Sequence, residues 1–596
     1  MAIKDYPNVH DMLLDTVTRQ PGVEAYRWIG PRGAVESVTW EQFYRETRRA
    51  ARALMALGVG HGDKVAIVSY TRYRWILVDL AAASIGACTV GVYQTLLAKD
   101  IRYIVDHSDS VVAFAQDPDQ LAKLRSVRDE LPKVRRVILF EGAAADDWAT
   151  DFESFLSLGD GVAEDELDRR IAAVKPDDAA AIVYTSGTTG VPKGAVLTHD
   201  NLCFTSQSVR HCLDIRDNEV AILFLPLAHV FARTCAYFSV QTGVTTVISR
   251  GLDFLLDDFA LARPHWFASV PAVYDKAHAR ALATAEAKGG VAHAIFNWAF
   301  AVGRQVSDLR LAGRPVPALL ALRHRVADRL VFKKLRARFG GRVRWCISGA
   351  APLSPQIGRF FHAAGINITE GLGMTENTSF SNVNRLATIR FGSVGQPGPG
   401  IEQRIAPDGE IQFRGRNVMK GYYKMPAETA EAITPDGWLC TGDLGEIDAD
   451  GFLRVTGRKK DLIITSGGKN VAPAVIEVTL ASSKYISRAC VIGDRRKYLT
   501  ALVSLDLERA AAWARQQGIA FSDPAALRSD PAVVALINAE VEERNRQFAS
   551  FETIKKVALV EEFTIDNGLL TPTLKVRRAA AAERYRDVVE AMYRED

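Results

Sequence analysis

The alternation of short β-branched runs with helix-length periodic stretches constrains the fold of this chain more than any other feature. Five runs are typical of buried strands: KVAIVSY (64–70), ACTVGVY (87–93), SVVAFAQ (110–116), RRVILFE (135–141) and AAAIVYT (179–185). Between them lie periodic stretches such as residues 40–57, which are followed by Gly58, a common helix stop. This alternation predicts an α/β fold with largely parallel sheets.

After Phe391 the sequence changes to short strands and tight turns. The segments PDGEIQFRG, TPDGWLCTGD and DADGFLRVTG each contain Asp-Gly, a pair that β-hairpins prefer. Beyond GRKKD (457–461), strand and helix patterns resume, including a helix near 530–549. We expect a large N-terminal domain over 1–457, with layered α/β subdomains and a small β-rich part at about 391–457, and a smaller C-terminal α+β domain over 462–596.

Bulk properties are those of an ordinary globular protein that is too long for one core. Of the 596 residues, 48% are hydrophobic and 24% are charged, and the net charge of +4 does not suggest a nucleic-acid partner. Seven scattered cysteines form no CxxC pair, which indicates a reduced, intracellular protein. The longest apolar stretch, Leu80 to Tyr93, is shorter than the ~20 residues that span a bilayer. We therefore expect a cytoplasmic protein without a transmembrane helix.

One loop carries the residues of a phosphate site. Residues 184–194 are YTSGTTGVPKG. The Walker A register fails, because Pro192 stands where the second glycine is needed and Gly194 follows the lysine. No GxGxxG opens a helix here, so a Rossmann dinucleotide loop is also excluded. Glycines still let backbone N–H groups approach an anion, and the hydroxyls and Lys193 add donors and charge.

This loop and six other motifs resemble the signatures of the adenylate-forming superfamily, which includes acyl-CoA synthetases, luciferases and peptide-synthetase adenylation domains. The others follow in the family's order: LPLAHVF (225–231), ISGAAPL (347–353), EGLGMTE (370–376), TGD (441–443), GRKKDLIITSGGKNV (457–471) and NGLLTPTLKVRR (567–578). LPLAHVF and the last motif resemble the long-chain fatty acyl-CoA synthetases most. The resemblance implies that a fatty acid reacts with ATP to give acyl-AMP and pyrophosphate, and that CoA then displaces AMP.

The resemblance implies which residues bind the phosphates and the metal ion. It implies that the β- and γ-phosphates lie against Thr185, Ser186, Gly187, Thr188, Thr189, Gly190 and Lys193. Thr185 and Glu376 would bind Mg²⁺, which prefers hard oxygen ligands beside phosphates. Thr375 would contact the α-phosphate. The other interpretation of Glu376 is a solvated loop acid.

Other motifs would bind the ribose and the adenine of the nucleotide. Asp443 would accept hydrogen bonds from both ribose hydroxyls, with Arg458 beside it. Gly349, Ala350 and Gly371 would border the adenine. The family commonly has an aromatic residue before the glycine of its GxTE run, whereas this chain has Leu372, so apolar packing would replace ring stacking.

Three features of the C-terminal part carry catalytic expectations. Lys575 would reach the α-phosphate and the carboxylate during adenylation; otherwise it is a surface lysine in a basic run with Arg577 and Arg578. Residues 458–461 would form a hinge, with the rotation centred on Asp461. Rotation would bring Gly467, Gly468 and Lys469 to the site. The glycines would let the pantetheine arm of CoA pass close to the backbone, and Lys469 would help to hold it.

Two features concern the fatty-acid substrate and the membrane from which it would come. His229 would lie near the substrate carboxylate or the acyl tunnel, unless it is a satisfied core histidine. Residues 304–338 contain ten Lys or Arg against two Asp, and Leu322, Val326 and Leu330, then Val331 and Leu335, recur at helical spacing. A basic amphipathic helix is typical of peripheral membrane association, here at the inner face of the membrane. The alternative is a packed helix with a solvated basic face.

Two other functions remain open. A fatty acyl-AMP ligase would pass the acyl group to a carrier protein, but such enzymes typically carry an insertion, and no extra segment is evident near 350–450. A non-catalytic acyl or nucleotide sensor is disfavoured because Glu376, Asp443 and Lys575 are all present. The oligomeric state is open, with a homodimer among the options.

Overall fold

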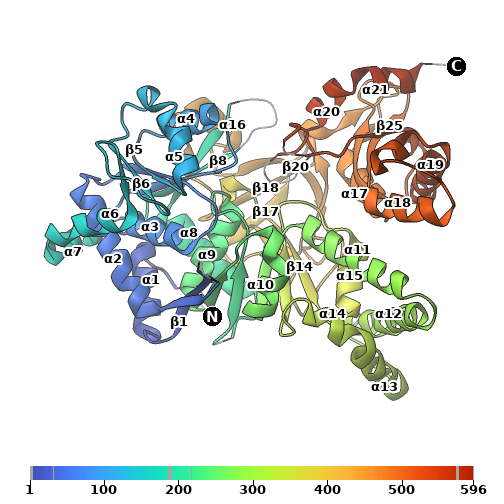
Figure 1. The fold of residues 1–596 in the computed structure, drawn as a ribbon, viewed down its shortest axis with the longest axis horizontal. Helices are drawn as coiled ribbons and strands as arrows, with labels where there is room; N and C mark the ends of the chain where they lie inside the picture. Colours follow the sequence, from blue (N-terminus) through green and yellow to red (C-terminus); the bar gives the residue numbers. More distant parts are fainter. Residues whose placement is uncertain are drawn as a thin grey trace.

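The computed structural model describes residues 4–30, 33–185, 191–216, 218–564, 566–571 and 576–594. These residues form two large sheets with helices between and around them, a small four-stranded sheet, and a separate C-terminal domain at the upper right of Figure 1. The predicted α/β fold, with a large N-terminal domain, a β-rich part and a smaller C-terminal α+β domain, is confirmed.

An eight-stranded sheet contains all five predicted strands. Its order is β19 (Gly421–Tyr422), β9 (Lys193–Thr198), β8 (Ala179–Thr185), β4 (Cys88–Val92), β3 (Lys64–Val68), β5 (Ser110–Ala115), β6 (Arg136–Leu139) and β7 (Ala149–Asp151). From β8 to β7 the strands are parallel, whereas β9 pairs with both β8 and β19 in antiparallel fashion. Parallel strands are covered on both faces, which explains why their sequences are nearly continuous apolar runs.

A nine-stranded sheet forms the second layer. Its order is β16 (Gln396–Pro397), β15 (Asn382–Val383), β14 (Asn367–Leu372), β13 (Trp345–Ser348), β12 (Trp266–Ser269), β10 (Val220–Leu223), β11 (Thr245–Ile248), β1 (Glu24–Ile29) and β2 (Val35–Thr39). The strands from β14 to β1 are parallel. Their carboxyl ends therefore meet at one edge, where open α/β sheets commonly place ligands.

Among the described residues up to position 363, fifteen α-helices accompany the strands of these two sheets. They are α1 (Val9–Arg19), α2 (Trp40–Ala56), α3 (Tyr73–Ser84), α4 (Ala98–His107), α5 (Pro118–Arg125), α6 (Phe152–Leu158), α7 (Glu164–Ala172), α8 (His199–Cys212), α9 (Val230–Thr242), α10 (Leu255–Ala262), α11 (Pro271–Lys288), α12 (Gly290–Leu311), α13 (Ala318–Ala327), α14 (Lys333–Ala337) and α15 (Pro355–Ala363). Nearly every residue of α3 and α9 is buried, as expected of helices that are apolar on all sides. The core around them joins residues of both sheets, such as Val65 and Ile222.

The apolar stretch from Leu80 to Tyr93 is split between the end of α3 and β4. Within the described residues, no helix combines the length and the apolar character needed to cross a membrane.

Two of the three Asp-Gly segments form the predicted hairpins, whereas the third, at 436–437, lies in the turn between α16 (Pro426–Ala432) and β20 (Leu439–Ile447). The four-stranded sheet consists of β17 (Ile401–Ile405), β18 (Glu410–Gly415), β20 and β21 (Leu453–Arg458), and α16 lies between β18 and β20 in the chain. The turns that join β17 to β18 and β20 to β21 contain Gly409 and Gly451, with φ of +84° and +80°. Positive φ explains the glycine at both positions.

The C-terminal domain has its own cores. Its elements are β22 (Ile463–Ile464), β23 (Asn470–Val471), α17 (Pro473–Ala481), β24 (Ile486–Ile492), β25 (Leu499–Leu505), α18 (Leu507–Gln516), α19 (Pro531–Asn545), β26 (Ile554–Val560), α20 (Arg578–Arg584) and α21 (Arg586–Tyr593). Both of its apolar clusters consist only of residues from Ile463 onward. It meets the N-terminal domain along α11, where Arg509 donates to the carbonyl of Ala279 and the Lys484 ammonium lies 3.4 Å from Glu286.

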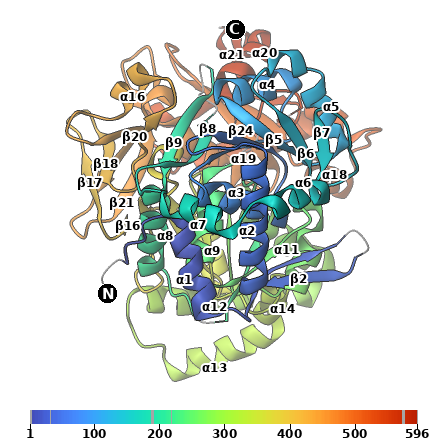
Figure 2. The ribbon, with the colours of Figure 1, turned by 90° about the vertical axis from the view of Figure 1, so that its left-hand side faces the viewer.

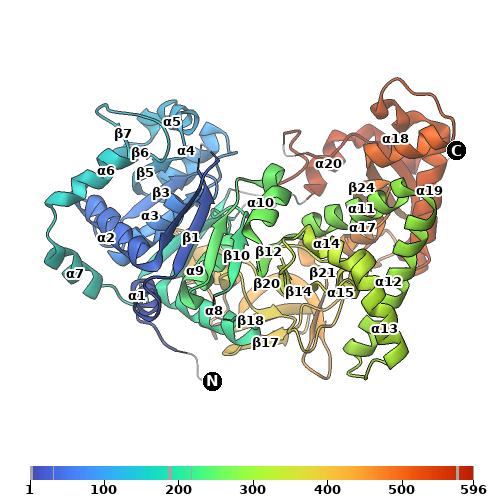
Figure 3. The ribbon, with the colours of Figure 1, turned by 60° about the horizontal axis from the view of Figure 1, so that its bottom comes forward.

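The basic stretch 304–338 is not one helix, as the sequence suggested, but a hairpin. Helix α12 ends at Leu311 and α13 begins at Ala318, and α13 continues through a π-helical segment, η4 (Asp328–Phe332), into α14. Gly313, with φ of +64°, and two prolines at 315 and 317 end the first helix. The two arms of the hairpin pack together through Phe300 and Phe332, whose ring centroids lie 5.2 Å apart. Figures 2 and 3 show α13 at the outer edge of the molecule.

Candidate active site

The ends of the predicted phosphate loop lie in the hairpin of β8 and β9. Thr185 is the last residue of β8 and pairs in register with Lys193, and its hydroxyl lies 3.4 Å from the Lys193 carbonyl. Ser186, Gly187, Thr188, Thr189 and Gly190 fall outside the described residues. Since β8 is parallel to β4, the loop starts at the carboxyl end of a parallel strand, a common position for anion sites.

Tyr422 connects this hairpin to Glu376. Strand β19 pairs with β9, with Tyr422 opposite Ala195. The Lys193 ammonium lies 5.2 Å from the centre of the Tyr422 ring, and the Tyr422 hydroxyl donates a 2.7 Å hydrogen bond to Oε1 of Glu376. The structure thus brings the ends of the phosphate loop and the predicted magnesium ligand together through a tyrosine that sequence reasoning missed. Only its position in GYYK, between two recognised motifs, could have drawn attention to it.

The electrostatics of this group fix the direction of the hydrogen bond. Burial, followed by the charge of Glu376, raises the pKa of the Tyr422 phenol well above its usual value, and the positive charge of Arg458 opposes this. The phenol therefore keeps its proton and donates a hydrogen bond to the carboxylate. The predicted ribose pair therefore lies within electrostatic range of Tyr422.

Glu376 is positioned by a tight turn after β14. Thr375 and Glu376 belong to a short 3₁₀ turn, η5 (Thr375–Asn377), and both are buried. Gly373 precedes the turn, where a Cβ atom would stand 1.9 Å from the carbonyl oxygen of Ser379, so only glycine fits. The Glu376 carbonyl accepts a 2.8 Å hydrogen bond from the backbone N–H of Met419. The carboxylate is therefore buried and held, rather than a solvated loop acid.

Asp443 and Arg458 face each other across β20 and β21. They are register partners, and Nε of Arg458 lies 3.5 Å from Oδ1 of Asp443. The backbone N–H of Asp443 donates a 3.0 Å hydrogen bond to the Thr441 hydroxyl. The side chain of Asp443 is partly exposed, so its oxygens are accessible to a ligand.

The predicted adenine-bordering residues follow the ends of two neighbouring parallel strands. Gly349 and Ala350 come directly after β13, while Gly371 and Leu372 end β14, and Ser348 pairs with Glu370 between them. Ala350 has a φ of +67°, a strained conformation for a residue with a side chain. Leu372 packs against an apolar core cluster as a partly buried side chain.

His229 caps helix α9. Its Nδ1 accepts a 3.1 Å hydrogen bond from the backbone N–H of Phe231. A Cβ atom at Gly349 would come within 3.2 Å of the Phe231 ring, so the start of α9 lies against the predicted adenine loop. The imidazole has a structural role, and its proposed proximity to the acid stays a prediction.

In this arrangement the predicted CoA residues lie in a turn of the C-terminal domain. Gly467, Gly468 and Lys469 form the exposed turn between β22 and β23, and the Lys469 ammonium lies 5.7 Å from the centre of the Phe551 ring. Among the described residues, no hydrogen bond, ion pair or ring contact joins this turn to Glu376 or Thr185.

Polar contacts hold the predicted hinge and the described residues next to Lys575. Asp461 ends a 3₁₀ turn, η6 (Lys459–Asp461), and the Lys459 ammonium lies 2.8 Å from Oε2 of Glu410. Lys575 falls outside the described residues, but Arg578 is placed. Its guanidinium donates a 2.6 Å hydrogen bond to the Val491 carbonyl and forms an ion pair with Glu477. Arg578 is thus a partly buried anchor that is paired within the domain, whereas Arg577 is exposed.

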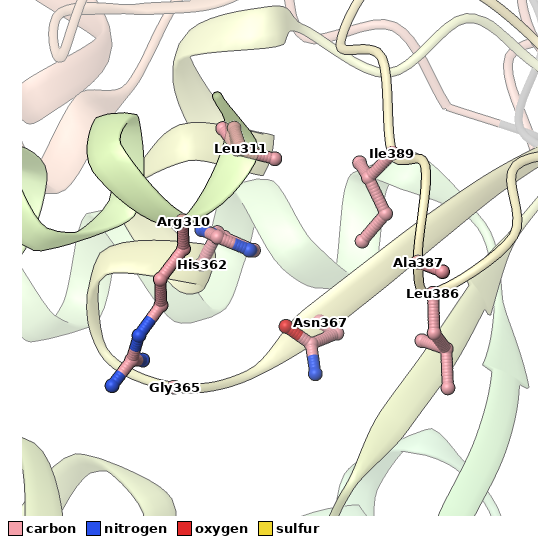
Figure 4. Close-up of a pocket in the computed structure, with 8 residues that line it drawn as sticks. All are labelled: Arg310, Leu311, His362, Gly365, Asn367, Leu386, Ala387 and Ile389. Atoms are coloured by element: carbon pink, nitrogen blue, oxygen red, sulfur yellow. The ribbon is translucent and has the colours of Figure 1, made fainter. Parts of the chain in front are cut away.

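A well-defined cavity lies elsewhere. It has a volume of about 310 Å³, and Figure 4 shows Arg310 and His362 on one side of it with Leu386 and Ile389 on the other. None of the predicted site residues lines it.

Oxygen donors at the candidate site fit a magnesium ion. One carboxylate oxygen of Glu376 accepts the Tyr422 hydroxyl, and among the described residues no donor contacts the other. Thr185 adds a hydroxyl at the start of the phosphate loop. One carboxylate and one hydroxyl are a common protein contribution to Mg²⁺ held mainly by phosphates and water.

Two family models match nearly the whole chain. The AMP-binding enzyme model matches residues 13–423, and the AMP-binding enzyme C-terminal domain model matches residues 460–596. The chain belongs to the AMP-binding enzyme family.

Relatives of this AMP-binding enzyme include proteins matched along most or nearly all of their length. A long-chain-fatty-acid–CoA ligase of Mycobacterium bovis, FadD15, is 37% identical over 600 residues, covering 100% of this chain and 98% of that one. The peroxisomal long chain acyl-CoA synthetase 6 of Arabidopsis thaliana is 34% identical, covering 96% of this chain and 84% of the other.

Solved structures confirm the fold of this AMP-binding enzyme. The anthranilate CoA ligase AuaEII with anthranoyl-AMP superposes with a TM-score of 0.74 at 20% identity, covering 99% of each chain. ATP-bound MatB from Rhodopseudomonas palustris superposes with a TM-score of 0.69 at 23% identity, covering 98% of this chain and 99% of the other.

Proposed function

We propose that this chain is an AMP-forming long-chain fatty acid–CoA ligase. It would couple ATP to a fatty acid, release pyrophosphate, and transfer the acyl group to the thiol of CoA. The structural observation that supports this most is the connected group Thr185, Lys193, Tyr422 and Glu376, with Asp443 and Arg458 beside it. The substrate class follows from the full-length relative that is 37% identical and is named for long-chain fatty acids.

In the first half-reaction the chain positions phosphates and offsets their charge. Thr185 to Lys193 would hold the β- and γ-phosphates through backbone N–H groups, hydroxyls and the Lys193 ammonium. Asp443 and Arg458 would hold the ribose, and Lys575 would approach the α-phosphorus as the carboxylate attacks. The chain needs no nucleophile of its own, because the carboxylate of the fatty acid attacks ATP directly.

A magnesium ion would be held by Glu376 and Thr185, where it would neutralise the leaving pyrophosphate. The Tyr422 hydroxyl fixes the rotamer of Glu376 and leaves one carboxylate oxygen available for the ion.

In the second half-reaction the C-terminal domain would turn about residues 458–461. We take 1–457 and 462–596 as the two bodies and Asp461 as the pivot. The turn would withdraw Lys575 and bring Gly467, Gly468 and Lys469 to the acyl-adenylate. The polar contacts of Arg509 and Lys484 with α11 would break in that movement.

The protein would act in the cytoplasm as a peripheral protein at the inner face of the membrane. Fatty acids partition into bilayers, and the helical hairpin that carries the basic stretch lies at the outer edge of the molecule (Figure 2). Its partners would be the fatty acid, ATP and CoA.

The test is pyrophosphate release by the purified chain with ATP, Mg²⁺ and palmitate, with and without CoA, compared with acetate and an aryl acid. Multiple turnover that needs both palmitate and CoA is expected. A single burst that ignores CoA would instead identify a fatty acyl-AMP ligase that loads a carrier protein. Absence of any ATP-dependent reaction would identify a sensor.

A further inference from the structure

The outer face of α13 and η4 is apolar. Leu319, Leu322, Val326 and Leu330 are 70%, 56%, 46% and 42% exposed. They follow one another at intervals of three, four and four residues, so they form a stripe on one side of the helix.

This stripe is not the packing face of the helix. On another side of the same segment, Ala327 and Phe332 are completely buried and pack with Phe300 of α12. The segment already has a core face, and the exposed stripe is a second apolar face without a partner among the described residues. Four large apolar side chains gathered within a dozen residues differ from the single ones that are scattered over ordinary protein surfaces.

Exposed cations border the stripe. Arg323, Arg325, Arg329, Lys333 and Lys334 are all exposed, and none forms an ion pair with a described residue. By contrast, Arg336 lies inward, with its guanidinium 2.7 Å from Asp328. The uncompensated positive charge is therefore placed around the apolar stripe and not on the buried side.

A second cavity opens beside the stripe. It has a volume of about 230 Å³ and is lined by Val306, Arg310, Val316, Ala321, His324 and Arg325. Two guanidinium groups and an imidazole in the same cavity as three apolar side chains suit a phosphate ester with the start of an alkyl chain.

We propose that the face formed by Leu319, Leu322, Val326 and Leu330 and its cationic border docks on an anionic phospholipid bilayer. The four apolar side chains enter the boundary between headgroups and acyl chains, and the arginines and lysines meet lipid phosphates. Charge complementarity favours an anionic bilayer over a neutral one. The stripe favours a bilayer over nucleic acid, whose phosphates would leave four apolar side chains uncovered. The inference adds the docking face and the lipid charge to the proposed function; docking itself does not require ligase activity.

The test is sedimentation of the full-length protein with vesicles of phosphatidylcholine alone or mixed with phosphatidylglycerol, at low and high salt. Binding is expected only to the anionic vesicles, and it should weaken at high salt because exposed charges are screened. Leu322→Gln with Val326→Gln should lower the partition coefficient about ten-fold or more. Arg323→Gln with Arg329→Gln should lower it by a similar factor and flatten the salt dependence.

Matched controls come from the same chain. Leu97→Gln removes a leucine that is 63% exposed at the start of α4, and Arg495→Gln removes an arginine whose side chain is 92% exposed. Both should bind as the unaltered protein does. Thermal unfolding of each variant should be unchanged, because the altered side chains are exposed.

Three results would overturn the proposal: no binding to anionic vesicles at low salt, equal binding to neutral vesicles, or equal losses in the control variants. A stripe variant that changes the oligomeric state but not vesicle binding would identify a contact between copies of this chain instead. Pyrophosphate release measured without vesicles reports the proposed ligase activity separately, so failure of one does not imply failure of the other.

Discussion

The hydroxyl of Tyr422 donates a 2.7 Å hydrogen bond to Oε1 of Glu376. The first residue belongs to a two-residue strand that pairs with the phosphate-loop hairpin, and the second to a turn that follows the other large sheet. This single bond therefore joins the two sheets at the place where the nucleotide and its metal are expected.

Tyr422→Phe tests whether this bond positions Glu376. Loss of a hydrogen bond to a buried carboxylate costs about 1–3 kcal/mol, so adenylate formation should fall about ten-fold or more, with a higher Mg²⁺ requirement. The measurement is pyrophosphate release as a function of Mg²⁺ concentration. Tyr423→Phe is the matched control, because that hydroxyl bonds to Asp109, outside the site. Equal effects of the two changes would mean that Tyr422 serves only folding.

Lys575→Gln should abolish the first half-reaction and spare the second. Removing the cation that offsets charge at the α-phosphorus should slow pyrophosphate release about 100-fold or more. Transfer of the acyl group from supplied acyl-AMP to CoA should continue. Arg577→Gln, an exposed neighbour, should change neither step. If both half-reactions slow to the same extent in Lys575→Gln, the residue does not act in adenylation alone.

Asp461→Pro should have the opposite effect. Proline fixes φ and so restricts the torsional change that a pivot needs. Adenylate formation should persist, while thioester formation is lost, as followed by separate assays of pyrophosphate and acyl-CoA. A variant in which the two rates fall together would argue against a pivot at this residue.

Glu370 should make stability depend on pH. Burial raises its pKa from 4.5 to about 7, and the N–H of Leu353, 2.9 Å from Oε1, offsets only part of this shift. Between these two values the folded state holds a proton that the unfolded chain has lost. The free energy of unfolding should therefore fall as pH rises from about 4.5 to 7, and level off above.

Glu370→Gln should remove that slope. Its amide oxygen can still accept the Leu353 N–H, and the change in unfolding free energy across the window should shrink by up to about 3 kcal/mol. Urea unfolding over a pH series is the measurement. Glu431→Gln, at an exposed position on α16, should leave the slope as it is. A slope that survives in Glu370→Gln would assign the pH dependence to another group.

Arg233→Met should destabilise the N-terminal domain strongly. Arg233 and Asp79 form an ion pair with almost no exposure, and the Tyr237 hydroxyl donates a 2.9 Å hydrogen bond to Asp79. Removing the arginine leaves a buried carboxylate unpaired, at a cost of about 3–5 kcal/mol in the free energy of unfolding.

The double change Asp79→Leu with Arg233→Met should recover most of that loss, because no charge then stays buried. Urea unfolding measures both variants. A single variant as stable as the unaltered protein would show that the pair contributes little.

The sequence by itself determined the layered α/β fold, the hairpins of the β-rich part and the family. The five apolar runs became strands of one sheet because a strand buried on both faces must be apolar throughout, and Asp-Gly became turns because few residues adopt positive φ. These are local constraints, and each depends on residues that are neighbours in the sequence.

Only the tertiary structure decided which distant residues meet. Tyr422 carries no motif, yet the pairing of β19 with β9 places it between Lys193 and Glu376. From the sequence, the basic stretch could equally have been a packed helix with a solvated face. Its packing against α12 in the structure shows which of its apolar residues face outward. Both outcomes depend on contacts between segments far apart in the chain, and such contacts leave no periodicity or spacing in the local sequence.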